Sequence, residues 1–152
     1  MKSMDRRTFL KLAGASSAAA AVTALPVAAI MSAGRLSFRA TGGLPARPLP
    51  AYATQVVEGT IDLDRRRGAV TSQVFAGHAD GVSDIALPGL SRVFRITDVT
   101  RLGGQIRLTG VIDDRSALIQ GENPTVEILI DRAAGLVRAP FAGNQVTLSL
   151  AS

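Results

Sequence analysis

Polar and apolar residues alternate along most of the chain after residue 54, and this alternation predicts β-strands. In 105–112 the apolar residues Ile106, Leu108 and Ile112 fall on one side. Successive side chains of a strand point to opposite faces, so the pattern places one face on a core and the other in water. Similar patterns predict strands at 55–63, 69–76, 91–99, 126–130 and 146–150, with shorter ones near 83–87 and 135–139.

Turn signals separate these segments, among them Asp80-Gly81, Pro88-Gly89, Gly103-Gly104 and Gly143-Asn144. No window of ten residues after residue 54 has a helical stripe. Seven or eight short strands at this spacing predict an all-β domain, an antiparallel sandwich or a small barrel, over residues 54–152.

Two stretches resemble each other, Asp64 to Gly68 and Asp131 to Gly135. Each predicts a hairpin in which the aspartate accepts backbone hydrogen bonds and the glycine takes a left-handed conformation. We favour shared hairpin chemistry over an internal duplication, which would give the domain two equivalent halves.

Residues 30–53 have the composition of a flexible linker. Gly42-Gly43 is followed by Pro45, Pro48 and Pro50, and prolines at this spacing favour extended chain over helix or a central strand. The alternative is a proline-rich ligand segment for a partner.

The first 29 residues have the order of a secretory signal. Basic residues at positions 2, 6, 7 and 11 precede an uncharged, alanine-rich run over 12–34. Val27-Ala28-Ala29 provides small residues for a cut after Ala29, and Pro26 breaks a helix just before it. The run is also about as long as the roughly 20 residues that cross a bilayer, so an uncleaved anchor is the alternative.

Within this signal, Arg6-Arg7-Thr8-Phe9-Leu10-Lys11 resembles a twin-arginine signal peptide. The signal residues are Arg6, Arg7, Phe9, Leu10 and Lys11, whereas Asp5 stands where the pattern has Ser or Thr. The resemblance implies that the twin-arginine translocase exports the folded protein. The expected location is periplasmic, extracellular or at the outer face of the cytoplasmic membrane, with membrane contact only through an uncleaved signal.

The net charge of +5 comes from the segments before the predicted domain. From Thr54 onward there are ten arginines against eleven acids, which leaves −1, while the signal and the linker carry the positive charge. Nucleic-acid binding depends on clustered positive charge, so we expect no nucleic-acid partner for the domain.

Few residues offer catalytic or cofactor chemistry. The chain has no cysteine, which excludes disulfides, thiolate catalysis and iron–sulfur clusters. The single histidine, His78, lies near Ser83, Asp84 and Ser91, which raises a hydrolase hypothesis, but the Gly-x-Ser-x-Gly elbow is missing. We therefore predict no catalytic residue, no metal site and no bound cofactor.

Several acidic and basic residues are candidates for binding sites. Asp113, Asp114 and Glu122 offer oxygen ligands for calcium, although their spacing matches no calcium-loop motif. Carboxylates at strand ends offer acid–base pairs for a glycan, and Arg65 to Arg67 offers a hairpin tip for an anionic polymer or headgroup. A solvated turn is the simpler interpretation of Asp113 to Arg115, and plain solvation is the simpler interpretation of the arginine run. Nothing in the sequence shows that two of the strand-end carboxylates face each other. The carboxylates at strand ends are Asp62, Asp98, Asp113 and Asp131, and the core aromatics are Phe75, Phe94 and Phe141.

The sequence leaves two classes of function. We favour an exported, non-enzymatic envelope module that binds an envelope protein or a wall component through a sheet edge or a loop surface. The alternative is an accessory subunit of an extracytoplasmic enzyme or redox complex, because such subunits use the twin-arginine route, or a small hydrolase.

Overall fold

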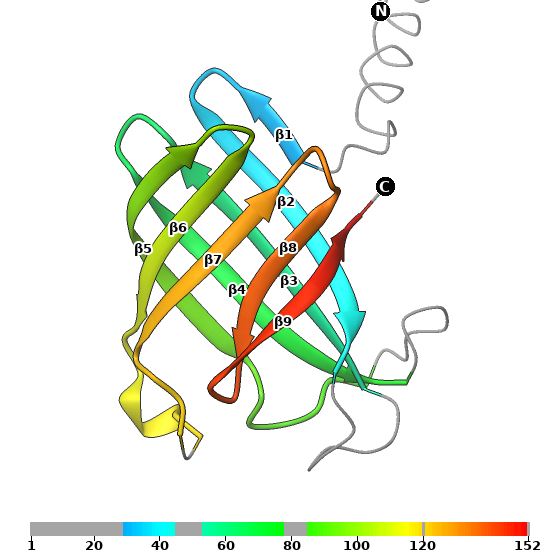
Figure 1. The fold of residues 1–152 in the computed structure, drawn as a ribbon. Helices are drawn as coiled ribbons and strands as arrows, with labels where there is room; N and C mark the ends of the chain where they lie inside the picture. The colour runs from blue at the N-terminus through cyan, green and yellow to red at the C-terminus, as the bar shows by residue number, and fades with distance from the viewer. Residues whose placement is uncertain (1–28, 45–52, 78–84, 120, 152) are drawn as a thin grey trace, which may run out of the picture.

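The computed structural model describes residues 29–44, 53–77, 85–119 and 121–151. Nine antiparallel strands follow one another in chain order within one sheet, and a 3₁₀ turn, η2, precedes the seventh (Figure 1). The elements are β1 (Ala29–Ser32), β2 (Arg35–Gly43), β3 (Ala53–Asp62), β4 (Arg67–Ala76), β5 (Arg92–Leu102), β6 (Gln105–Ile112), η2 (Arg115–Ala117), β7 (Thr125–Asp131), β8 (Leu136–Phe141) and β9 (Asn144–Leu150).

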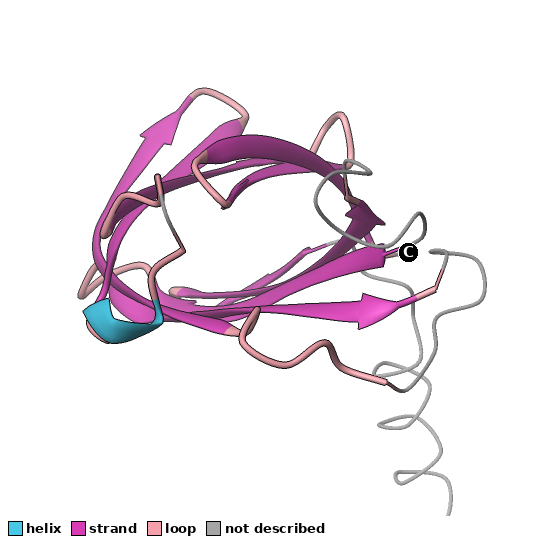
Figure 2. Ribbon diagram, turned by 90° about the horizontal axis from the view of Figure 1, so that it is seen from below, coloured by secondary structure: helices cyan, strands magenta, loops and turns pink. Residues whose placement is uncertain are grey.

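Pairing between β2 and β9 closes the sheet into a barrel. β2 pairs with β3 along its whole length, and Ala40 and Thr41 pair with Leu150 and Ser149 of β9. Viewed from below, the strands enclose one interior (Figure 2). Strands β2 to β9 are therefore an eight-stranded antiparallel barrel, while β1 adds to the free part of β2. This confirms the predicted all-β fold class and selects the barrel over the sandwich.

The prediction of a linker over 30–53 is wrong for residues 30–43, which form β1 and β2. Leu36, Phe38 and Ala40 are buried in the barrel, while Arg39 between them is exposed. The alternation is the same as in the later strands, but the following glycines and prolines obscured it. Ala53, the last residue of the predicted linker, begins β3. Residues 45–52 of that linker and residues 1–28 of the signal lie outside the described residues.

The later strands agree closely with the sequence pattern. Residues 105–112 form β6 as predicted, and the other long strands differ from their predicted ends by a few residues. The short strand expected near 83–87 is not formed by its described part, where Ala86 makes a single bridge with Phe75.

Inward-facing side chains from all eight barrel strands fill the interior with one apolar cluster. Ile128 is fully buried and Glu127 is exposed, so the predicted register of that strand is confirmed. Phe94 lies in the cluster and Phe141 packs against it, whereas Phe75 is half-buried on β4. Small eight-stranded barrels are commonly filled by side chains in this way.

The barrel has two ends, named here by their position in Figure 1. The upper end carries the hairpins β1–β2, β3–β4, β5–β6 and β7–β8. The lower end carries the connections β6–β7 and β8–β9, the last residues of β2 and β4, and the first residues of β3 and β5.

Candidate functional site

Three polar side chains point into the lower end of the barrel from neighbouring strands. Gln55 of β3, Ser72 of β4 and Arg92 of β5 are almost fully buried. Ser72 lies opposite Arg92 in the β4–β5 ladder, and Gln55 Nε2 donates to Ser72 Oγ at 2.8 Å. These three residues, the inner polar layer, interrupt an otherwise apolar interior.

Glu122, from the connection between β6 and β7, neutralises Arg92. The guanidinium donates to both carboxylate oxygens at 3.2 Å, and Nη1 donates to the carbonyls of Gly89 and Ser91. The carboxylate also accepts the Ile119 amide at 2.8 Å. The Arg92 and Glu122 side chains are only 5% and 8% exposed, so this pair fixes the β6–β7 connection against the lower end.

The Gln55 side chain reaches towards the opposite wall, where its Nε2 donates to the Pro140 carbonyl at 3.3 Å. A carbonyl can only accept, so this contact sets the orientation of the amide. Gln55 Oε1 is left buried without a hydrogen-bond donor among the described residues. A buried acceptor without a partner costs about 1–3 kcal/mol, and in a native protein it calls for a specific reason.

The barrel wall is open beside this layer, between the lower halves of β7 and β8. These strands pair only through Leu129, Ile130 and Asp131, close to their hairpin. Pro140 cannot donate to a ladder, which is consistent with the end of the pairing before it. The resulting wall opening has a volume of about 120 Å³ and is lined mainly by Glu122, Asn123, Thr125, Glu127, Asn144 and Gln145.

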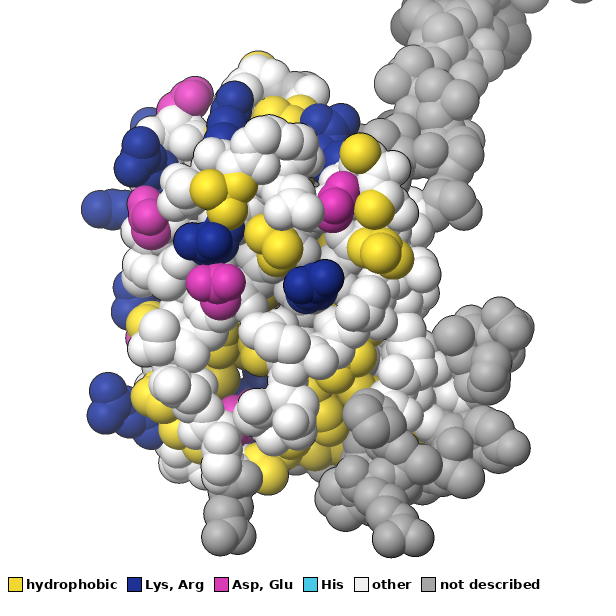
Figure 3. Space-filling view, viewed as in Figure 1, with side chains coloured by type: hydrophobic (Ala, Val, Ile, Leu, Met, Phe, Trp, Pro, Cys, Tyr) yellow, Lys and Arg dark blue, Asp and Glu magenta, His cyan; other side chains and the backbone are white. Residues whose placement is uncertain are grey.

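The wall opening and the inner polar layer are connected. Glu122 lines the opening and pairs with Arg92, and Pro140 lines the opening while its carbonyl holds Gln55. Figure 3 shows the surface hollowed low on the face that carries β7, β8 and β9, with charged side chains inside the hollow. Mouths and clefts of β-barrels with a few convergent polar groups are typical binding sites.

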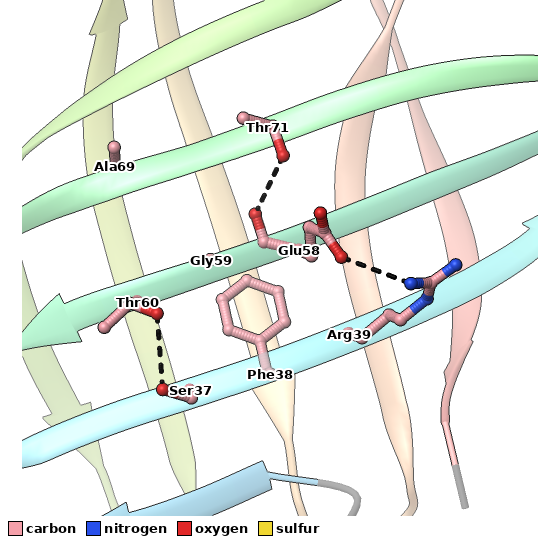
Figure 4. Close-up of a pocket in the computed structure, with 8 residues that line it drawn as sticks. All are labelled: Ser37, Phe38, Arg39, Glu58, Gly59, Thr60, Ala69 and Thr71. Carbon is pink, nitrogen blue, oxygen red and sulfur yellow. Dashed lines mark hydrogen bonds and ion pairs between the residues drawn. The ribbon is translucent and has the colours of Figure 1, made fainter. Parts of the chain in front are cut away.

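A second, more open depression lies on the outer face of β2, β3 and β4 (Figure 4). Gly59 lies at its centre, and a Cβ there would come within 3.1 Å of the Phe38 ring. The charged groups at its side, Arg39 and Glu58, already pair with each other at 3.4 Å. This depression therefore presents fewer unpaired groups than the lower end.

The candidate calcium ligands Asp113, Asp114 and Glu122 have separate partners. Asp113 accepts two hydrogen bonds from Arg95 at 2.8 Å, and this contact lowers the pKa of Asp113. Hydrogen bonds from Ser116 lower the pKa of Asp114, which caps η2. Glu122 belongs to the buried pair. The described residues contain no group of three His, Asp or Glu side chains that could hold a metal ion.

The strand-end carboxylates weighed as acid–base pairs do not pair with one another. At the upper end, Asp62 contacts Arg65 at 3.7 Å and Asp98 contacts Arg66 at 3.6 Å. Asp131 accepts a hydrogen bond from Gln105 in the same region. The arginine run is thus exposed on a hairpin tip, with two of its members next to acids.

The two similar hairpins use their residues differently. In the β3–β4 turn, Asp62 rather than Asp64 accepts the turn amides, and Arg66 rather than Gly68 is left-handed, with φ +54°. The 131–135 hairpin follows the prediction, with its aspartate accepting a turn amide and its glycine at φ +68°. The sequence match therefore does not align structurally equivalent residues in the two turns.

The residues of the hydrolase hypothesis give no site within the described part of the chain. His78, Ser83 and Asp84 lie outside it. Ser91 is described, and its carbonyl accepts from Arg92.

Sequence reasoning missed the inner polar layer, although a signal was present. Arg92 alternates with Phe94 and Ile96, which places it on the core face, and Gln55 stands two residues before the buried Val57. A polar residue that stands two positions from buried residues of the same strand faces the core, where it needs a hydrogen-bonding or oppositely charged partner.

Comparisons with protein-family models, curated proteins and solved structures found no match. Among the described residues, no helix has the length and apolar character needed to span a bilayer.

Proposed function

We propose that the chain is an exported envelope module that binds a ligand without transforming it, at the lower end of the barrel. The binding site consists of the wall opening and the inner polar layer behind it. The observation that carries this proposal is Gln55 Oε1, a buried acceptor that has no donor in the part of the chain that the structure describes and that lies next to an opening in the wall.

The composition of the layer supports binding over a purely structural role. A layer selected for stability alone would be apolar or fully paired, because half-satisfied polar networks destabilise a core. Departures from this rule are concentrated at functional sites. The compensated Arg92–Glu122 pair keeps the region polar without leaving a net charge beside the core.

Export is supported by the twin-arginine resemblance. We expect Arg6→Lys combined with Arg7→Lys to leave stable, folded protein in the cytoplasm, because these arginines address the translocase. Cell fractionation and immunoblotting measure the outcome. Arg35→Lys with Arg39→Lys, which changes two exposed arginines of β2, is the control and should leave export intact. Normal export of the signal variant would remove this part of the proposal.

Replacing the inner polar layer tests the binding role. We expect Gln55→Leu combined with Ser72→Ala to keep or raise the free energy of unfolding, measured by urea denaturation. Replacing both partners of a buried hydrogen bond by apolar groups is nearly neutral. The unpaired Gln55 Oε1 disappears as well, which offsets the loss of the 3.3 Å bond to the Pro140 carbonyl at the wall opening.

Ile128→Ala is the control for a structural interior position. This substitution should lower the free energy of unfolding by about 2–5 kcal/mol, because it leaves a cavity at a fully buried site. If the Gln55 and Ser72 double variant is destabilised as strongly as Ile128→Ala, the layer is structural and the proposed site is wrong.

A further inference from the structure

We propose that the wall opening binds a small neutral ligand rich in hydroxyl groups, of the size and chemistry of a single sugar residue. This inference rests on the proposed function and specifies its ligand class. It follows from the hydrogen-bonding groups that the protein leaves unused at the opening.

Three exposed amide side chains line the opening, and within the described part of the chain each uses only one of its two polar groups. Asn123 Oδ1 accepts the Thr125 amide, while its Nδ2 has no partner among the described residues. Gln145 Nε2 donates to the Glu127 carbonyl at 3.2 Å, and no described residue donates to its Oε1. Asn144 Nδ2 donates to a carbonyl of its own turn at 3.5 Å, and its Oδ1 likewise has no donor among the described residues. The opening therefore offers both donors and acceptors.

The charges at the opening are compensated by the protein itself. Glu122 is paired with Arg92, and the Glu127 carboxylate lies 3.7 Å from Arg107. An anion would meet these two carboxylates, and a cation would compete with two arginines. A hydroxyl group is both donor and acceptor, so it matches the mixed amide groups without disturbing either pair.

The geometry limits the ligand to a small molecule. Above, the opening ends where β7 and β8 pair. Below, Gly143 packs so closely on the β6–β7 connection that a Cβ there would lie 2.7 Å from the Gly121 carbonyl. A volume of about 120 Å³ between these limits suits one small ring. At the inner side, Gln55 Nε2 contacts the Pro140 carbonyl, and the buried Gln55 Oε1 has no donor among the described residues.

The test is a titration of the exported, ¹⁵N-labelled protein with glucose, followed through its side-chain amide resonances. We expect the amide signals of Asn123, Gln145 and Gln55 to shift, with a Kd of roughly millimolar for so small a ligand. The amide of Gln73, exposed on the outer face of β4, should not move. Gln145→Leu should weaken binding about fivefold, equivalent to one lost hydrogen bond, whereas Gln73→Leu should not change it.

A parallel titration with sodium acetate separates this inference from the proposed function. If acetate shifts these signals at the same or lower concentrations than glucose, the ligand class is wrong while the site stands. If neither compound shifts them, the ligand class and the site both fail. Glucose binding that is unchanged by Gln145→Leu would also overturn the assignment to the wall opening.

Discussion

Residues 54–152, expressed without the segment before them, should fail to fold cooperatively. The sequence pattern assigned the whole β domain to these residues, but the barrel is closed by β2, which precedes them. Removing the segment before residue 54 takes Leu36, Phe38 and Ala40 out of the core. It also leaves β3 and β9 without their shared neighbour, and open strand edges promote aggregation.

A chain that starts at Ala33 is the matched control for this truncation. It lacks β1, which pairs only with β2, but it keeps β2 and therefore the closed barrel. We expect this chain to unfold in one cooperative transition in urea, followed by circular dichroism, and the chain starting at Thr54 to show no such transition. Cooperative unfolding of both chains would mean that β2 is dispensable for the fold.

The sequence predicted the strands well where each one carried its own signal. The alternation in 105–112 and 126–130 depends only on which side chains face the core, a local property of a strand with one buried face. β2 has the same alternation at Leu36, Phe38 and Ala40, but the glycines and prolines after it suggested a tether. Closure into a barrel depends on pairing between β2 and β9, which no local pattern reports.

The candidate site was harder to predict because its parts are far apart in the chain. Gln55 Nε2 meets the Pro140 carbonyl across 85 positions, and Arg92 meets Glu122 across 30. Glu122 was considered as a calcium ligand, since its loop contains two other acids, yet its partner is an arginine from β5. The alternation of Arg92 with Phe94 and Ile96 is a signal of burial that the sequence reasoning missed, and no local pattern shows which group compensates its charge.

Arg92→Leu should lower the free energy of unfolding by about 3–5 kcal/mol, more than the replacement of any exposed charged residue of the barrel. It removes the counterion of Glu122, whose side chain is only 8% exposed, and leaves the carboxylate with the Ile119 amide as its remaining donor. Removing one partner of a buried ion pair costs more than the pair contributes, because the remaining charge is stranded away from water. Urea denaturation measures the difference.

Two comparisons show whether burial is the cause of this loss. Arg95→Leu removes a second arginine of β5. Arg95 also donates two hydrogen bonds to one carboxylate, that of Asp113, but this pair lies at the exposed surface. Solvent screens exposed pairs, so we expect no substantial change in stability. The double variant Arg92→Leu with Glu122→Leu should recover most of the loss, since replacement of a whole buried pair by apolar residues is often neutral. If Arg92→Leu is no worse than Arg95→Leu, the pair does not hold the lower end of the barrel, and the β6–β7 connection is fixed there by other contacts.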